Sequence, residues 1–194
     1  MIRSEVITCI NSGWIIGDDG WCEQALRLES PNFNARPLPD DISLLVIHNI
    51  SLPAGQFGGT AITDLFQNNL DCSAHESFES LRDIKVSSHF LIRRDGRLLQ
   101  FVSTLDRAWH AGVSSFDGRD ACNDFSIGIE LEGTDVLPFA PAQYDCLGWL
   151  TLALLNRFSI THIVGHDEIA PGRKTDPGPC FEWACYRQRI SGSA

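Results

Sequence analysis

Two histidines of this chain each stand at the end of an apolar, strand-like run. His48 ends ISLLVIH (42–48) and His166 ends HIVGH (162–166). Open sheets place their functional sites at the carboxyl ends of strands, so we expect both imidazoles to project into one site. Ten residues after His166 comes Asp176, in a loop that three prolines brace.

Two imidazoles and one carboxylate form a three-ligand set that leaves a fourth coordination position open. Hydrolytic zinc sites have this arrangement, with water in the open position. The three residues are far apart in the sequence, so only the fold can bring them together. Asp167 is the rival carboxylate, but as the neighbour of His166 on an extended segment it should point away. The pattern therefore favours His48, His166 and Asp176 as the ligands of one Zn²⁺ ion.

A candidate general base lies in FSIGIELEG (125–133), where apolar residues alternate with Gly128, Glu130 and Glu132. Residues two apart on a strand share a face. Glu130 is either an exposed strand carboxylate or the base that takes a proton from the attacking water. Glu132 has the same parity and is the alternative base.

Lys174 precedes Asp176 by two residues. It is either a solvated loop lysine or a side chain that stabilises an oxyanion. The chain has no G-x-S-x-G elbow for serine catalysis and no phosphate-binding P-loop. A cysteine nucleophile is the less favoured alternative, since Cys72 lies near His75 and Cys180 follows the proline-rich loop.

The patterns around these residues predict a mixed α/β fold, with helices packed on one central mixed sheet. Strands are expected at 42–48, 125–133 and 162–166, a hairpin turning at Asp95-Gly96 within 87–103, and helices at 61–69, 74–82, 142–158 and near 180–190. Residues 1–41 are rich in glycine and proline and are expected to be mostly loop. We expect the whole chain, 1–194, to form a single domain.

Composition narrows the possible functions. The 194 residues carry a formal net charge of −10 with a pI of about 4.9, which disfavours nucleic acid and anionic membranes as partners. No apolar stretch approaches the roughly 20 residues of a membrane-spanning helix. The N-terminus lacks a secretory signal pattern, and seven cysteines without C-x-x-C spacing suit reduced thiols. These features predict a cytoplasmic protein.

Five blocks of the sequence resemble the zinc N-acetylmuramoyl-L-alanine amidases that act on 1,6-anhydromuropeptides in bacterial cell-wall recycling. The blocks are LLVIHNISLPAGQFGG (44–59), VSSHFLIRRDG (86–96), AWHAGVSSFDGR (108–119), CNDFSIGIELEGTD (122–135) and GHDEIAPGRKTDPGP (165–179). The likeness runs from about Gly13 to Arg187, and the last block is highly specific. The wider superfamily also contains phage lysozyme-type amidases and peptidoglycan recognition proteins.

The resemblance implies hydrolysis of the amide between the lactyl group of 1,6-anhydro-N-acetylmuramic acid and the L-alanine of the stem peptide. It implies one zinc ion per chain on His48, His166 and Asp176, with Glu130 and Lys174 as the catalytic pair. The resemblance also implies an anhydromuropeptide as the substrate, and the chain is expected to be a monomer. Residues in matching blocks are expected to line the cleft or support it from behind: Asn49, His89, Trp109, His110 and Arg119.

Two other functions fit the same fold. A non-catalytic binder of wall fragments is one, although such a protein need not keep the ligands and the catalytic pair. A secreted amidase is the other, disfavoured by the missing signal and the odd number of cysteines.

Overall fold

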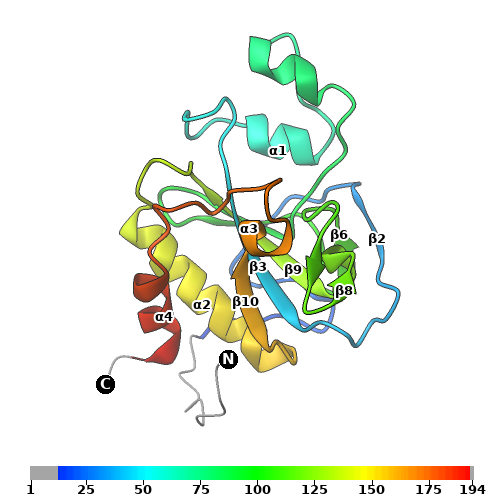
Figure 1. Cartoon of the computed structure of the whole chain (residues 1–194), viewed down its shortest axis with the longest axis vertical. Coiled ribbons are helices and arrows are strands. Elements are labelled where there is room, and N and C mark those ends of the chain that lie inside the picture. Colours follow the sequence, from blue (N-terminus) through cyan, green and yellow to red (C-terminus); the bar gives the residue numbers. More distant parts are fainter. Residues whose placement is uncertain (1–12, 193–194) are drawn as a thin grey trace.

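A six-stranded mixed sheet forms the centre of the protein (Figure 1), seen in a computed structural model that describes residues 13–192. Its strands, in spatial order, are β1 (Leu26–Arg27), β5 (Leu98–Gln100), β4 (Phe90–Ile92), β9 (Ser126–Glu132), β3 (Leu44–Ile50) and β10 (His162–Gly165). β3 lies parallel to β9 and β10, and β4 lies parallel to β9. The β4–β5 pair is the antiparallel pair of this sheet, and β1 lies parallel to β5 at its edge. The predicted mixed α/β fold is therefore confirmed.

The two central strands, β3 and β9, are apolar because both of their faces are covered. On one face, Leu45 and Ile47 join Ile127 and Ile129 in the main core, where all four side chains are fully buried. The alternate residues of β3 point to the opposite face, and this parity includes His48. The strand pattern thus presents its apolar side to the core and His48 to the other side.

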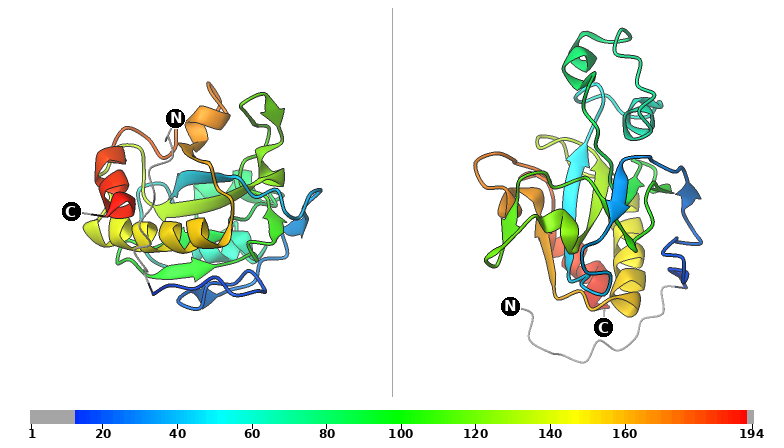
Figure 2. Two further views of the ribbon diagram at one scale, coloured as in Figure 1. Left: turned by 90° about the horizontal axis from the view of Figure 1, so that it is seen from below. Right: turned by 90° about the vertical axis from the view of Figure 1, so that its right-hand side faces the viewer.

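Helix α2 (Pro141–Arg157) covers the core face of the sheet, and α4 (Trp183–Ser191) packs beside it (Figure 2). Proline is well tolerated in the first turn of α2, and the side chain of Gln143 accepts the N–H of Ala140 at 3.0 Å. Leu147, Leu150 and Leu154 are fully buried against the strands. The predicted helix at 142–158 is confirmed.

Residues 51–86 rise beyond the carboxyl ends of the central strands and are seen at the top of Figure 1 and of the right-hand view in Figure 2. This segment contains α1 (Ala61–Phe66), as predicted, and a 3₁₀ helix, η1 (Glu76–Leu81), where the sequence suggested an ordinary helix. The predicted hairpin is present as β4 and β5, with Gly96 at a positive φ of 84° in the turn.

Several short elements were not predicted. They are β2 (Phe33–Ala35) paired with β6 (Asp106–Ala108), β7 (Ser115–Phe116) paired with β8 (Arg119–Asp120), the 3₁₀ helix η2 (Cys122–Asp124) and the one-turn helix α3 (His166–Ile169). Two- and three-residue strands are too short to show periodicity. The expected loop at 1–41 holds β1 and β2, and its residues 1–12, including Cys9, lie outside the described part.

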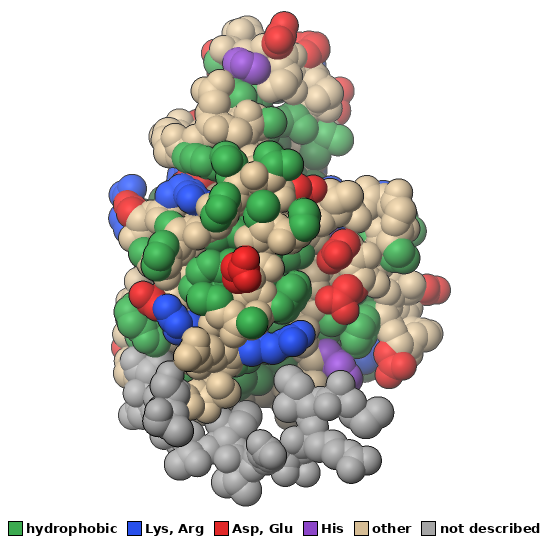
Figure 3. Space-filling view, turned by 60° about the vertical axis from the view of Figure 1, so that its left-hand side comes forward, with side chains coloured by type: hydrophobic (Ala, Val, Ile, Leu, Met, Phe, Trp, Pro, Cys, Tyr) green, Lys and Arg blue, Asp and Glu red, His purple; other side chains and the backbone are tan. Residues whose placement is uncertain are grey.

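One face of the described surface carries charges of both signs (Figure 3). On the face shown in Figure 3, Lys and Arg side chains form small separate groups and Asp and Glu are spread among them. Among residues 13–192, no helix combines the length and the apolar character that crossing a membrane would require. The six cysteines in this part of the chain are free thiols.

Candidate metal centre

Three side chains from separate elements meet at the carboxyl ends of the central strands. His48 lies in β3, and His166 begins α3 directly after β10, one residue beyond the end of the strand. Asp176 comes from the loop after α3, where its carbonyl accepts the N–H of Asp167 at 3.0 Å. Since β3 and β10 are parallel neighbours, their ends bring the two histidines to one edge of the sheet.

The ligand atoms of these residues form a nearly equilateral triangle. His48 Nδ1 and His166 Nδ1 are 2.9 Å apart, and Asp176 Oδ2 lies 3.1 Å from the first and 3.0 Å from the second. One face of a tetrahedral zinc site has edges of about 3.3 Å, given bonds of about 2.0–2.1 Å. Among the described residues, this is the His, Cys, Asp and Glu group that is able to hold a metal ion.

The hydrogen-bond partners on the outer side of the two imidazoles show why a cation fits the triangle. His166 Nε2 faces the carbonyl oxygen of Ala111 at 3.1 Å, so this nitrogen carries the proton and Nδ1 presents a lone pair. His48 Nε2 lies 2.9 Å from His110 Nδ1, and when His48 donates in this contact its Nδ1 also presents a lone pair. The triangle then contains two nitrogen lone pairs and a carboxylate oxygen, and a divalent cation satisfies all three.

Burial favours the charge states that metal ligands need. It lowers the pKa of His48 to about 4, so the ring is neutral at pH 7. Burial alone would raise the pKa of Asp176, but its contacts with His166 and His48 outweigh this and hold the pKa below its usual value. A neutral imidazole and an ionised carboxylate are the metal-binding forms of these groups.

Glu130 stands next to this triangle. It is the register partner of His48 across the β3–β9 pair, and it is 9% exposed, so it is not a solvent-facing strand carboxylate. Burial, together with the nearby charge of Asp176, raises the pKa of Glu130 well above 4.5, while Lys174 opposes the shift. Its Oε2 has no hydrogen-bond partner among residues 13–192. A buried carboxylate with a free oxygen is suited to accept a proton.

Glu132 has the same parity but different surroundings. Its Oε1 binds Arg93 Nη1 at 2.9 Å and the N–H of Gly58 at 2.7 Å, and its Oε2 accepts the N–H of Arg94 at 3.2 Å. Arg93 also donates to the carbonyl of Gly59 at 3.0 Å. Both oxygens of Glu132 are therefore engaged in holding the loop that follows β3.

An open cleft of about 410 Å³ lies beside the triangle. Its wall includes Asp176, the exposed Lys174 and Asn49, which follows His48 on β3. Asn49 donates to Asp135 Oδ1 at 2.7 Å and to the carbonyl of Pro177 at 3.1 Å. This side chain joins the two loops that form the cleft wall.

Two of the histidines that were expected to line the cleft or to support it from behind, His89 and His110, lie behind it. The ring of His89 is fully buried, and its Nδ1 accepts the N–H of Gly128 at 3.0 Å. His110 contacts His48 and, through Nε2, Ser126 Oγ at 3.2 Å. Trp109 is partly exposed and donates from Nε1 to Asn34 Oδ1 at 2.7 Å.

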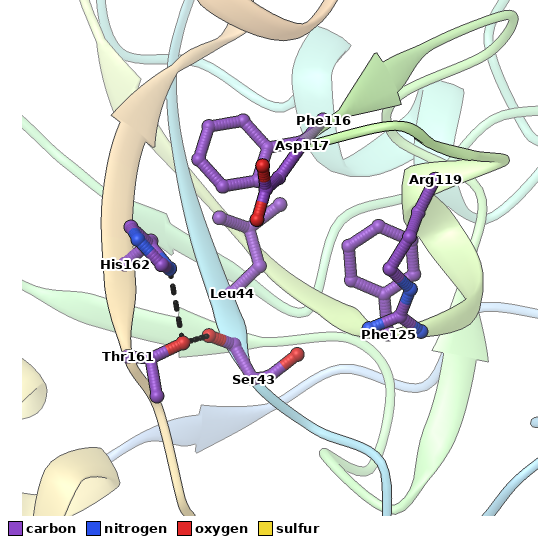
Figure 4. Close-up of a pocket in the computed structure, with 8 residues that line it drawn as sticks. All are labelled: Ser43, Leu44, Phe116, Asp117, Arg119, Phe125, Thr161 and His162. Carbon is purple, nitrogen blue, oxygen red and sulfur yellow. Dashed lines mark hydrogen bonds between the residues drawn. The ribbon is translucent and has the colours of Figure 1, made fainter.

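Arg119 lies in a separate place. Figure 4 shows it at a small pocket of about 100 Å³, with Phe125 beside it and His162 across the pocket. Its guanidinium is stacked 3.8 Å over the ring of Phe125 and paired with Asp41 at 2.5 Å. His162 begins β10, so this pocket is at the opposite end of that strand from His166.

Some residues that shape the site were missed. Asn123 accepts the N–H groups of His110 and Ala111, and Arg173 donates to the carbonyl of Ala111 at 2.6 Å. Arg173 adjoins Lys174 in the GRKTD motif, and this position was a usable signal. Asn123 stands in a short polar turn, and its local sequence carries no signal.

Comparison with known proteins agrees with this geometry. The sequence profile described as N-acetylmuramoyl-L-alanine amidase matches residues 38–179. The chain is 51% identical to the 1,6-anhydro-N-acetylmuramyl-L-alanine amidase AmpD of Citrobacter freundii, with 91% of this chain and 96% of that protein covered. The corresponding protein of Escherichia coli K12 is 50% identical, with 90% and 96% covered. The crystal structure of a selenomethionine derivative of AmpD superimposes with a TM-score of 0.88 at 52% identity, covering 89% of this chain and 98% of that one.

Proposed function

The chain belongs to the N-acetylmuramoyl-L-alanine amidase family, and we propose that it hydrolyses the lactyl–L-alanine amide of 1,6-anhydromuropeptides with one Zn²⁺ ion on His48, His166 and Asp176. The observation that carries the metal assignment is the triangle of three ligand atoms, 2.9–3.1 Å apart, in which two imidazole nitrogens face a carboxylate oxygen. The relatives whose names specify this substrate are about half identical to the chain over nearly its full length.

Zinc in this position supplies Lewis acidity, which makes water more acidic and polarises a carbonyl. Because two of its ligands are neutral imidazoles and one is a carboxylate, the bound zinc ion would keep a formal charge of about +1, and this charge supports its Lewis acidity. The remaining work falls to side chains of the protein. Glu130 accepts the proton of the attacking water and passes it to the leaving nitrogen of L-alanine. Its raised pKa makes Glu130 a stronger proton acceptor, and as a carboxylic acid it is still acidic enough to give the proton to the leaving amine.

Lys174 provides positive charge at the cleft wall next to Asp176. As the water adds to the amide carbon, negative charge develops on the carbonyl oxygen, and the ammonium group stabilises it. Asn49 and Trp109 are proposed to contact the substrate, since Asn49 lines the cleft and Trp109 exposes part of its ring. The buried His89 and the partly buried His110 support the site from behind.

The setting of the enzyme is also a proposal. We place it in the cytoplasm, acting as a monomer of one domain on imported wall fragments. The support is the odd number of cysteines in the sequence and the free thiols of the six described cysteines.

The test combines metal analysis with hydrolysis of anhydromuramoyl-tripeptide. One zinc per chain, release of the tripeptide and loss of activity on chelation are expected. The matching substrate with an ordinary, non-anhydro sugar measures selectivity for the anhydro form. Tight binding of the fragment without any cleavage would instead identify a non-catalytic wall-fragment binder.

A further inference from the structure

Two consecutive residues contact both histidines of the metal triangle. The ring of His110 meets His48 Nε2 at 2.9 Å, and the carbonyl of Ala111 meets His166 Nε2 at 3.1 Å. Each contact lies on the side of the imidazole that faces away from the triangle. The segment 110–111 therefore supplies the outer hydrogen-bond partner of each ring, and such partners govern which ring nitrogen carries a proton.

Asn123 holds this segment in place. Its Oδ1 accepts the N–H of His110 at 3.1 Å and the N–H of Ala111 at 2.8 Å. The side chain is 5% exposed, so water does not readily replace it. One buried oxygen atom of Asn123 thus fixes the backbone of His110 and Ala111. These two residues in turn contact the two metal histidines.

The position of Asn123 is itself fixed from the N-terminal segment. The buried guanidinium of Arg36 donates to the carbonyls of Asn123 at 3.2 Å, Asp124 at 3.1 Å and Ser126 at 2.8 Å. These carbonyls belong to η2 and to the first residue of β9. Arg36 therefore ties the turn that carries Asn123 to the strand that carries Glu130.

The His110 ring lies in a confined space against the backbone of Gly128. A Cβ atom added at Gly128 would lie 2.5 Å from Cγ of His110, which is closer than real contacts allow. A shift of the 110–111 segment consequently has little room to be absorbed without moving the ring away from His48. Small displacements at Asn123 are passed on to the metal ligands for this reason.

We propose that Asn123 is a positioning residue of the metal centre: its side-chain oxygen fixes His110 and Ala111, which set the tautomers of His48 and His166. The identity of the metal rests on the proposed function, whereas the tautomers are properties of the metal-free chain. Loss of an outer partner of a ligating histidine typically weakens metal affinity about 10–100-fold.

Three substitutions in the full-length protein test this role. Asn123→Ala removes the acceptor, and Asn123→Leu removes it while nearly keeping the volume. Asn123→Asp keeps an oxygen that can accept both N–H groups. Gln100→Ala is the matched control, because Gln100 is also a fully buried amide whose oxygen accepts a backbone N–H, that of Cys22 at 2.7 Å, but it lies on β5 away from the site.

The first measurement is zinc affinity by competition with a chelator. We expect Asn123→Ala and Asn123→Leu to bind zinc about 10–100-fold more weakly than the parent. Asn123→Asp should lie much closer to the parent, and Gln100→Ala should match it even if its melting temperature falls. The role is refuted if the Ala or Leu variant that folds binds zinc as tightly as the parent, or if Gln100→Ala loses as much affinity.

The second measurement uses long-range ¹H–¹⁵N NMR of the histidine rings in zinc-free protein. The parent should show both His48 and His166 protonated on Nε2, and the Asn123→Leu variant should show a mixture of tautomers. Unchanged tautomers in that variant would overturn the proposal. If the parent shows these tautomers and Asn123→Leu shows the mixture, but the parent neither binds zinc nor cleaves anhydromuropeptides, the proposed function is refuted and the positioning role is supported.

Discussion

Glu130 of β9 is the register partner of His48 of β3, so a buried carboxylate and a buried imidazole stand side by side on one face of the sheet. Parallel strands in register carry side chains of equal parity to the same side, and here that side is the edge where His166 and Asp176 also arrive. The proton acceptor and one metal ligand, His48, are therefore held by backbone hydrogen bonds of the sheet, whereas Asp176 comes from a loop.

Replacing Glu130 by Gln should reduce turnover by roughly 10²–10⁴-fold while leaving one zinc per chain. The amide has nearly the shape of the carboxylate but does not accept the proton of the attacking water. Turnover of anhydromuramoyl-tripeptide and zinc content of the same preparation check this expectation.

Glu132→Gln is the matched control for that experiment. Glu132 forms a buried pair with Arg93, and removing one partner of such a pair typically costs about 3–5 kcal/mol of stability. The Glu132 variant should therefore lose stability but keep more turnover per folded molecule than the Glu130 variant. A fully active Glu130→Gln enzyme beside an inactive, folded Glu132→Gln enzyme would move the base assignment to Glu132.

Glu130→Gln should also change how the stability of the zinc-free protein depends on pH. Burial raises the pKa of Glu130 in the folded state above the value of 4.5 expected in the unfolded chain. Between these two values the folded state holds a proton that the unfolded chain has released, so the free energy of unfolding falls as pH rises. The variant does not titrate there and should lose this contribution. Urea unfolding of both proteins from pH 5 to pH 8 measures the difference, and parallel curves would show that Glu130 carries no raised pKa.

Asp176→Asn should lower zinc affinity far more than Asp167→Asn. Asp176 Oδ2 is one corner of the ligand triangle, and an amide oxygen supplies no charge to the ion. Asp167 is next to His166 in the sequence but is exposed and is not part of the triangle. Chelator competition on both variants provides the comparison, and equal losses would favour Asp167 as the third ligand.

Lys174→Ala should leave the zinc in place and lower the turnover number by roughly 10²–10³-fold, the usual cost of one oxyanion donor. Lys174→Arg keeps the positive charge and should recover part of the loss. If the alanine variant changes only KM, the lysine binds the substrate without acting on the developing charge.

Local sequence patterns were sufficient for the main elements of the fold. The apolar runs at 42–48 and 125–133, the turn at Asp95-Gly96 and the helical spacing of 142–158 all lie where the structure has β3, β9, the β4–β5 hairpin and α2. These signals are local because a helix or strand with one buried face repeats its apolar residues with the period of that element. The same reasoning placed His48 and His166 at strand ends, and the structure brings them together with Asp176.

Only the tertiary structure distinguished the roles of residues that have similar local sequence contexts. Glu130 and Glu132 lie on the same strand and the same face. Arg93, about 40 residues away in the sequence, forms an ion pair with Glu132 and not with Glu130. Asn123 has an ordinary turn context, yet its oxygen holds the segment that orients both metal histidines. Such roles depend on partners brought together by packing across the chain, and the periodicity of a single segment carries no information about them.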